Sequence, residues 1–233
     1  MIYKALLSFL FFFAFSPKFI SATENKNGIG LKKEFKSSLD ITIDLAYTNL
    51  HANQYSVPKH EIFAQALKGY YLLKEKGLVK KSILTLVDFS MSSNSKRLWV
   101  IDLATNTVLF QSLVAHGRNT GAEFAKNFSN SAQSFKSSLG FYTTGEIYTG
   151  KHGMSLKLDG LEKGVNDNAR NRGVVIHGAD YVSDVFIKNN KRLGRSQGCP
   201  ALPEELSKAI IDVIKDKSCF FIYHPSLISK IIS

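Results

Sequence analysis

The sequence predicts a mainly β domain with packed helices, an α+β fold, preceded by a helical N-terminal lead-in. Two observations lead to this class. After Gly77 the chain carries several short apolar runs, separated by turns rich in serine, asparagine and glycine, which is the spacing typical of strands. These runs are apolar at successive positions, so both faces of the strands are expected to be buried. Such strands occur in a sandwich or a closed barrel, where a facing layer covers each side.

The elements before the strands are expected to be helical. A weak apolar pattern indicates a short helix over residues 39–50. The pattern is clearer over residues 56–76, where Ser56 is placed to cap a helix and Pro58 lies in its first turn. Apolar side chains then recur at helical spacing as far as Gly77, so we expect this helix to pack on the β-rich region.

The β-rich region is expected to contain strands, a long loop and two further helices. Residues 117–138 show little periodicity and are interpreted as a loop over a cleft. A short helix is expected at residues 182–189, and a second helix begins near Pro203 with acidic residues in its first turn. The expected strands lie at residues 83–89, 97–103, 107–115, 140–148, 154–158, 173–177 and 218–223.

The first residues of the chain have the pattern of a signal peptide. They contain a short basic start, an apolar run and small residues up to Ala22, after which cleavage is expected. The apolar run is short for a membrane helix, so we expect export to the periplasm or cell wall without a stable membrane span after cleavage; a retained anchor is the alternative. The expected parts are a signal peptide at 1–22, a polar lead-in at 23–55 and a domain at 56–225, with a helix at 56–76 and a β-rich core at 80–225.

The chain is strongly basic. It has 30 Lys and Arg residues against 19 Asp and Glu residues, a formal net charge of +11. Loss of residues 1–22 removes two lysines, so 28 basic residues remain against 19 acidic ones, a net charge of +9. This excess fits an anionic partner such as a wall rich in peptide carboxylates. No motif of a nucleic-acid-binding module accompanies it, so nucleic acid is not expected as a partner.

Two residues far apart in the sequence, His177 and Cys199, form a candidate base and nucleophile. His177 ends an apolar run, and Cys199 follows Gly198 in a tight turn. A thiol nucleophile needs a base to accept its proton and backbone donors to hold the oxyanion, and a glycine-bearing turn can align such donors. The second cysteine, Cys219, lies in an apolar run and is interpreted as a core residue, so both cysteines are expected to be free thiols.

The chain carries His177-Gly178 followed by Ser196-Gln197-Gly198-Cys199. This arrangement resembles the catalytic motif of the L,D-transpeptidases, the YkuD-like cell-wall cross-linking enzymes. Gln197 and Ala201 depart from the commoner pattern, which has His at the first position and Arg or Asn at the second, so the contacts of those positions are not transferred. The segments that resemble the branch called the murein L,D-transpeptidase catalytic domain family are 114–118, 137–142, 150–153, 155–161 and 166–169, within residues 57–223.

The resemblance implies a YkuD-like β-sandwich or barrel and an exported peptidoglycan L,D-transpeptidase that needs no cofactor. Cys199 would attack a stem peptide and form a thioester, with His177 as base and acid. The amides of Gly198 and Cys199 would hold the oxyanion, a carbonyl near Gly178 would orient His177, and Ser196 would lie beside them. The products are 3→3 cross-links, and carbapenem-type β-lactams are expected as covalent inhibitors.

Charged and polar residues near these motifs are candidate substrate contacts. Arg118 and Arg195 are candidates for binding substrate carboxylates, because arginine forms forked hydrogen bonds to them. Lys151 and Arg172 are further candidates because of their positive charge. Arg195 and the helix that begins near Pro203 are also expected to favour the thiolate and so to lower the pKa of Cys199. The four substrate contacts that we select are Arg195, Tyr142, His116 and Arg118.

Several alternatives to a cross-linking enzyme stay open. With water as the acceptor the same site is an L,D-carboxypeptidase, and with a lipoprotein lysine it is an anchoring enzyme. A catalytically silent wall-binding module is a further alternative, because Gln197 and Ala201 depart from the family pattern. A metal site is not expected, since His116, His152 and His177 are far apart and the chain has no HExxH or Cys-x-x-Cys spacing.

Overall fold

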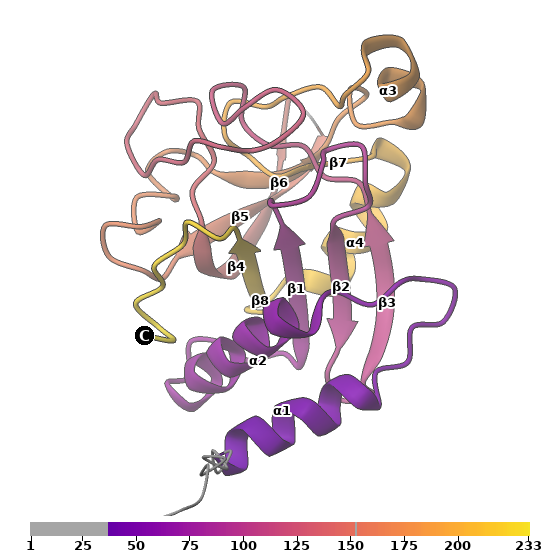
Figure 1. Ribbon diagram of the computed structural model, residues 1–233. Coiled ribbons are helices and arrows are strands. Elements are labelled where there is room, and N and C mark those ends of the chain that lie inside the picture. Colours follow the sequence, from indigo (N-terminus) through magenta and orange to yellow (C-terminus); the bar gives the residue numbers. More distant parts are fainter. Residues whose placement is uncertain (1–36, 152) are drawn as a thin grey trace, which may run out of the picture. The chain divides into compact units, whose positions relative to one another are not determined.

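One eight-stranded mixed sheet forms the centre of the computed structural model, which describes residues 37–151 and 153–233 (Figure 1). The expected signal peptide and the first part of the lead-in lie outside the described residues. The strands lie in the order β3-β2-β1-β8-β4-β5-β6-β7; the pairs β1–β8 and β6–β7 are parallel and the others antiparallel. Their bounds are β1 Ile83–Asp88, β2 Leu98–Asp102, β3 Thr107–Ser112, β4 Gly140–Gly150, β5 Gly153–Gly160, β6 Val175–Gly178, β7 Ala201–Leu202 and β8 Cys219–Tyr223.

The two edges of the sheet approach each other. Just beyond β3, the Ala115 amide donates a hydrogen bond to the Ala201 carbonyl of β7 at 2.9 Å. A second bridge joins Gly117 to Ser196, next to the turn that carries Cys199. The sheet therefore nearly closes into a barrel, which confirms the fold class predicted from strands buried on both faces.

Helices cover both faces of the sheet. Side chains of a strand alternate between its faces, and in β1 Leu84 and Leu86 join the apolar cluster of α2 whereas Val87 joins that of α4. Strand β8 divides in the same way, with Phe221 on the α2 side and Phe220 on the α4 side. The helices are α1 Ser38–Thr48, α2 His60–Glu75, α3 Asp184–Asn190 and α4 Glu204–Ile214.

The helix predicted over 56–76 begins only at His60, and Ser56 does not cap it. The Ser56 hydroxyl accepts a hydrogen bond from Gln111 Nε2 at 2.7 Å, and its carbonyl accepts one from Trp99 Nε1 at 2.9 Å. Lys59 occupies the N-cap position and contributes no side-chain cap. Contacts with β2 and β3 therefore determine the conformation of this segment, and the predicted cap was wrong.

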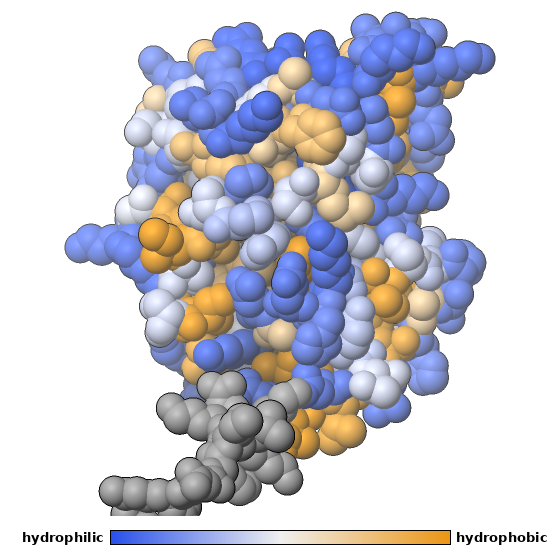
Figure 2. Space-filling view, viewed as in Figure 1, coloured by the Kyte–Doolittle hydropathy of each residue, from blue (hydrophilic) through white to orange (hydrophobic). Residues whose placement is uncertain are grey.

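Helix α1 corresponds to the weak pattern predicted at 39–50. It begins with a capping box between Ser37 and Asp40 and buries Ile43 in the cluster around α2. Ile41 and Leu45 on the same helix are 50% and 57% exposed. Figure 2 shows one face of the molecule, on which hydrophobic side chains lie scattered among hydrophilic ones. Within residues 37–151 and 153–233, no helix has the length and apolar character that crossing a membrane requires.

Candidate active site

A cavity of about 480 Å³ contains both His177 and Cys199 in its lining. His177 belongs to β6, and Cys199 comes from the turn before β7. The 117–138 loop, predicted to lie over a cleft, contributes Gln133 and Phe135 to the wall. The cavity thus joins the two motif segments to a loop that contains neither of them.

Strand pairing explains why residues so far apart in sequence meet. His177 pairs with Ser155 of β5 on one side and with Ala201 of β7 on the other. Cys199 lies two residues before Ala201, so the β6–β7 pairing carries the turn to the end of β6. Strand β7 was not predicted, because two residues give no readable periodicity.

The backbone orients the imidazole of His177. This side chain is only 4% exposed, and its Nδ1 lies 2.8 Å from the carbonyl oxygen of Gly178. A carbonyl can only accept a hydrogen bond, so we assign the proton of the neutral ring to Nδ1. The basic lone pair then belongs to Nε2, which is the arrangement that a general base requires.

Ser196 holds the turn that carries the thiol. Its hydroxyl donates to the Cys199 carbonyl at 2.6 Å and accepts from the Gly198 amide at 3.0 Å. Gly198 has φ +127°, and a Cβ there would lie 2.9 Å from the Lys136 carbonyl oxygen. Both the backbone conformation and the contact with the loop therefore favour glycine at this position.

The same turn corrects one expectation about the oxyanion hole. The Gly198 amide donates to the Ser196 hydroxyl, so it is engaged within the turn rather than directed at a substrate oxygen. Gly198 is therefore a structural part of the turn. The amide of Cys199 is retained as the candidate oxyanion donor.

The thiol of Cys199 lies against the start of β6. The Val175 amide donates to Sγ at 3.5 Å, and Sγ lies 3.7 Å from the Gly173 carbonyl oxygen, to which a protonated thiol can donate. Burial raises the pKa of the thiol, whereas the Val175 amide and the positive charge of Arg172 act in the opposite direction. The net direction is upward, so the expected lowering of this pKa was wrong.

Two features explain that error. Helix α4 begins at Glu204, after β7 and Pro203, so its N-terminus does not directly follow the thiol. Arg195 lines the cavity, but its Nη1 donates to the carbonyls of Arg118 and Gly121 at 3.2 and 3.1 Å. The cation that favours the thiolate is Arg172 instead.

Both cysteines are free thiols, as the sequence predicted. Cys219 lies in β8 and is fully buried in the cluster around α2. Burial strongly raises the pKa of its thiol. It is a core residue and plays no part in the cavity.

Two of the four selected substrate contacts are buried away from the cavity. The Tyr142 side chain is 0% exposed, and its hydroxyl donates to the Ser138 carbonyl at 2.9 Å. His116 is 1% exposed and accepts a hydrogen bond from Arg97 Nη2 at Nδ1, 2.9 Å away. Burial and this cation lower the pKa of His116 to about 4, so the ring is neutral. Neither residue can reach a bound peptide, and both assignments were wrong.

The remaining two selected residues, Arg195 and Arg118, differ in whether they line the cavity. Arg195 lines the cavity, whereas Arg118 is exposed outside it, with its guanidinium 4.0 Å from the ring centroid of Phe135. Phe135 in turn forms part of the cavity wall. Arg118 therefore supports a wall residue and is not itself in the lining.

Sequence reasoning missed three aromatic residues of the lining, Phe135, Tyr148 and Tyr181. Tyr148 lies on β4 near its hairpin with β5, and Tyr181 follows His177 by four residues. Burial raises the pKa of Tyr181 to about 12, so it stays a neutral hydroxyl. Its proximity to His177 in sequence is the one signal that could have identified it.

The charged groups of the described lining are all basic. They are Lys151, Arg172 and Arg195, and no carboxylate contributes to this lining. A cavity of this charge favours a substrate that carries carboxylates. Over the part of the chain that the structure describes, no group of three or more His, Cys, Asp or Glu side chains is placed to hold a metal ion.

Comparison with known families places the whole site within one domain. The family described as L,D-transpeptidase catalytic domain matches residues 54–223, which include every residue of the cavity. No curated protein matches the sequence.

Among solved structures, the chain is similar to an L,D-transpeptidase from Mycobacterium smegmatis at 12% identity, over 61% of this chain and 59% of that chain, with a TM-score of 0.38. It is also similar to the helical cell shape determining protein Pgp2 from Campylobacter jejuni at 15% identity, over 71% of this chain and 58% of that one, with a TM-score of 0.41. The chain therefore spans less than two thirds of the length of either protein.

Proposed function

This chain belongs to the L,D-transpeptidase catalytic domain family, and on that premise we propose that it is an exported cysteine acyltransferase that acts on peptidoglycan stem peptides. The observation that carries the proposal is the shared cavity of Cys199 and His177, in which the Gly178 carbonyl orients the imidazole. Export to the periplasm or cell wall rests on the leader pattern of residues 1–22.

The first half-reaction forms a thioester. Nε2 of His177 accepts the thiol proton, and the Cys199 thiolate attacks the carbonyl of the diamino acid at stem position three. The Cys199 amide stabilises the oxyanion that develops. The bond to the terminal D-alanine then breaks, and the imidazolium returns its proton to the departing amine. The Cys199 thioester and free D-alanine are the products.

The second half-reaction transfers the acyl group. The side-chain amine of a second stem attacks the thioester carbonyl, and His177 accepts the proton that this amine loses. The carbon–sulfur bond breaks, which regenerates the Cys199 thiolate and leaves a 3→3 cross-link. No cofactor enters either step.

An L,D-carboxypeptidase is the second candidate, and the charge of the cavity favours it. An acceptor amine is a cation in its resting form, and the described lining offers it Lys151, Arg172 and Arg195 but no carboxylate. Water carries no charge and meets no such repulsion. Hydrolysis of the thioester would release a tripeptide stem from the same Cys199 intermediate.

Intact-mass measurement tests the proposal. The wild-type protein is incubated with a carbapenem and, separately, with a tetrapeptide stem with or without an acceptor stem. We expect one covalent carbapenem adduct, loss of D-alanine from the tetrapeptide, and either a cross-linked dimer or a tripeptide.

Two variants serve as matched controls. Cys199→Ala should give no adduct and no product, whereas Cys219→Ser should retain both. Product formation by Cys199→Ala would refute the acyltransferase. Failure of the wild type to form either adduct or product would favour the silent wall-binding module.

A further inference from the structure

A half-buried arginine beside the thiol has no carboxylate partner. Arg172 lines the cavity and lies directly before the Gly173 carbonyl and Val175 amide that contact Sγ. Within the residues that the structure describes, no ion pair joins it to an Asp or Glu side chain. A buried charge without a counter-ion is costly, so its surroundings must satisfy it in another way.

Residues 129–138 of the loop accept the hydrogen bonds of this guanidinium through uncharged oxygen atoms. Arg172 Nη1 donates to the Ser129 carbonyl at 2.8 Å and to the Ser138 hydroxyl at 3.2 Å. Nη2 donates to the Lys136 carbonyl at 2.5 Å and to the Ser134 hydroxyl at 3.4 Å. The guanidinium thus spans the loop from residue 129 to residue 138, and this span contains the wall residues Gln133 and Phe135.

The same guanidinium packs against the turn of the nucleophile. A Cβ on Gly198 would lie 3.3 Å from Arg172 Nη2 and 2.9 Å from the Lys136 carbonyl oxygen. The Ser137 hydroxyl also donates to the Gly198 carbonyl at 3.1 Å. The loop and the arginine therefore both contact the turn at Gly198, the residue that precedes Cys199.

We propose that Arg172 is a positioning residue that fixes the 129–138 loop as a wall of the cavity and serves as the counter-charge of the Cys199 thiolate. This inference rests on the proposed function and adds to it the residue that links substrate binding to nucleophile activation. Carbonyl and hydroxyl ligands hold the guanidinium without cancelling its charge, so the thiolate is the anion that the charge stabilises.

Other titratable groups surround the thiol and belong in the interpretation of any pH profile. His177 faces it from β6, Tyr181 follows β6, and Arg195 precedes the turn. Lys151 and Tyr148 line the cavity from the β4–β5 hairpin, and Tyr142 of β4 interacts electrostatically with Arg172. In the proposed mechanism His177 accepts the thiol proton, so the measured midpoint belongs to the Cys–His pair and not to either residue alone.

Alkylation of Cys199 by iodoacetamide, followed across pH by intact mass, tests the charge. This reaction needs a thiolate but no stem peptide, so it is independent of the transpeptidase assignment. We expect Arg172→Gln to raise the pH midpoint of the alkylation rate by about one unit. This shift is a tenfold loss of thiolate at pH values below the midpoint. Arg172→Lys should stay within about 0.3 unit of wild type, since it keeps the charge.

Turnover of the stem peptide tests whether Arg172 fixes the 129–138 loop. Lysine cannot make the forked contacts that span residues 129–138, so Arg172→Lys should raise KM several-fold while its alkylation midpoint stays unchanged. Arg170→Gln is the matched control, because it removes an arginine two residues away that lies outside the cavity. It should change neither the midpoint nor KM.

Each of the two roles proposed for Arg172 would be contradicted by a specific result. A midpoint for folded Arg172→Gln that equals wild type or Arg170→Gln would remove the counter-charge role, and a KM unchanged in Arg172→Lys would remove the loop role. If Arg172→Gln does not fold, a raised midpoint in Arg172→Lys would overturn the charge assignment. Absence of wild-type turnover with normal alkylation would instead refute the proposed function.

Discussion

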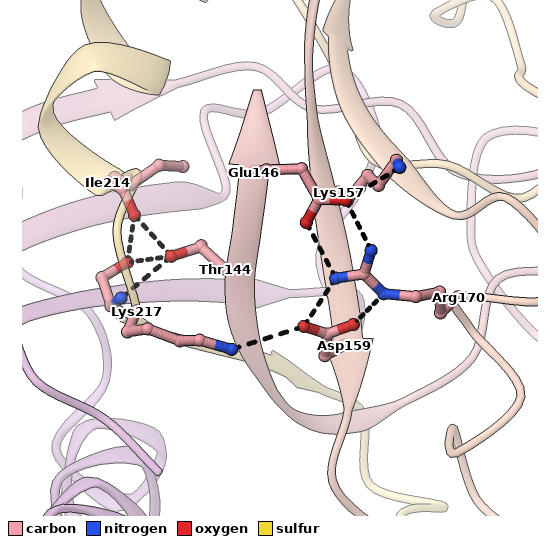
Figure 3. A network of polar contacts seen from close by, with 8 residues as sticks. Thr144, Glu146, Lys157, Asp159, Arg170, Ile214 and Lys217 are labelled. Atoms are coloured by element: carbon pink, nitrogen blue, oxygen red, sulfur yellow. Dashed lines mark hydrogen bonds and ion pairs between the residues drawn. The ribbon is translucent and has the colours of Figure 1, made fainter. Parts of the chain in front are cut away.

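Arg170 and Arg172 lie two residues apart before β6, yet their surroundings differ in kind. Arg170 is exposed, and Figure 3 shows its guanidinium between two carboxylates: Nη1 donates to Glu146 at 2.8 Å, and Nη2 donates to Asp159 at 2.9 Å. Lys157 and Lys217 extend this network on the surface. Arg172 is half-buried and bonded to carbonyl and hydroxyl oxygens of the cavity loop.

The difference shows that the partners of an arginine determine whether its charge can act on a neighbouring group. Its hydrogen bonds to Asp159 and Glu146 raise the pKa of Arg170, and the negative charges of these two carboxylates cancel its field locally. Burial lowers the pKa of Arg172, and its uncharged partners leave the field intact. Solvent weakens the first network, whereas the second lies in the wall of a cavity where charges act more strongly.

Removing the chemistry of the cavity should have the largest effect. Cys199→Ala and His177→Ala should each reduce turnover at least about 1,000-fold without unfolding the protein, because acyl transfer needs both groups. Glu146→Gln, in the surface network, should retain wild-type turnover. Steady-state assays on a tetrapeptide stem, with circular dichroism for folding, measure the difference. Comparable losses at Glu146 and Cys199 would erase the distinction between the two regions.

A change at the turn that contacts Arg172 should come next. Gly198→Ala places a side chain at φ +127° and brings its Cβ within 2.9 Å of the Lys136 carbonyl. We expect a loss of about 1–3 kcal/mol in unfolding free energy from the strained backbone, together with a large fall in turnover. Urea unfolding and the stem-peptide assay report the two effects. Wild-type stability in this variant would show that the loop yields freely at the turn.

The pH dependence of acylation is the third comparison. Burial raises the pKa of Cys199, and the thiolate is the reactive form, so carbapenem acylation should rise with pH. Its midpoint should lie above the ordinary thiol value of about 8.5. Stopped-flow acylation of the wild type from pH 6 to 10 measures this limb. A midpoint below that ordinary value would mean that Arg172 and the Val175 amide outweigh burial.

The surface network should give the smallest effect. Arg170→Gln should lower Tm by no more than about 4 °C, because exposed ion pairs contribute little. Hydrogen bonds from Arg170 lower the pKa values of Glu146 and Asp159, so any stabilisation exists above the ordinary carboxyl pKa and disappears as the pH falls. Thermal melts of both proteins should therefore converge at acidic pH. A Tm difference that grows on acidification would contradict this origin.

Much of the fold could be predicted because it depends on local patterns. The apolar runs of β1 and β8 are long enough to show that both faces are buried, and the structure distributes their side chains to two cores. The 56–76 helix was also predicted, but its first residues were not. Ser56 binds Gln111 and Trp99 instead of capping the helix, and a contact of that kind has no local signature.

The sequence by itself determined the candidate nucleophile and base, the free thiols and the class of the fold, because motif spacing and apolar periodicity are properties of short segments. Only the tertiary structure decided the roles of charged and polar residues. It buried Tyr142 and His116, placed β7 between Cys199 and α4, and selected Arg172 rather than Arg195 as the cation beside the thiol. The physical reason is that burial and electrostatic partners depend on segments distant in sequence, which the chain brings together only when the sheet closes.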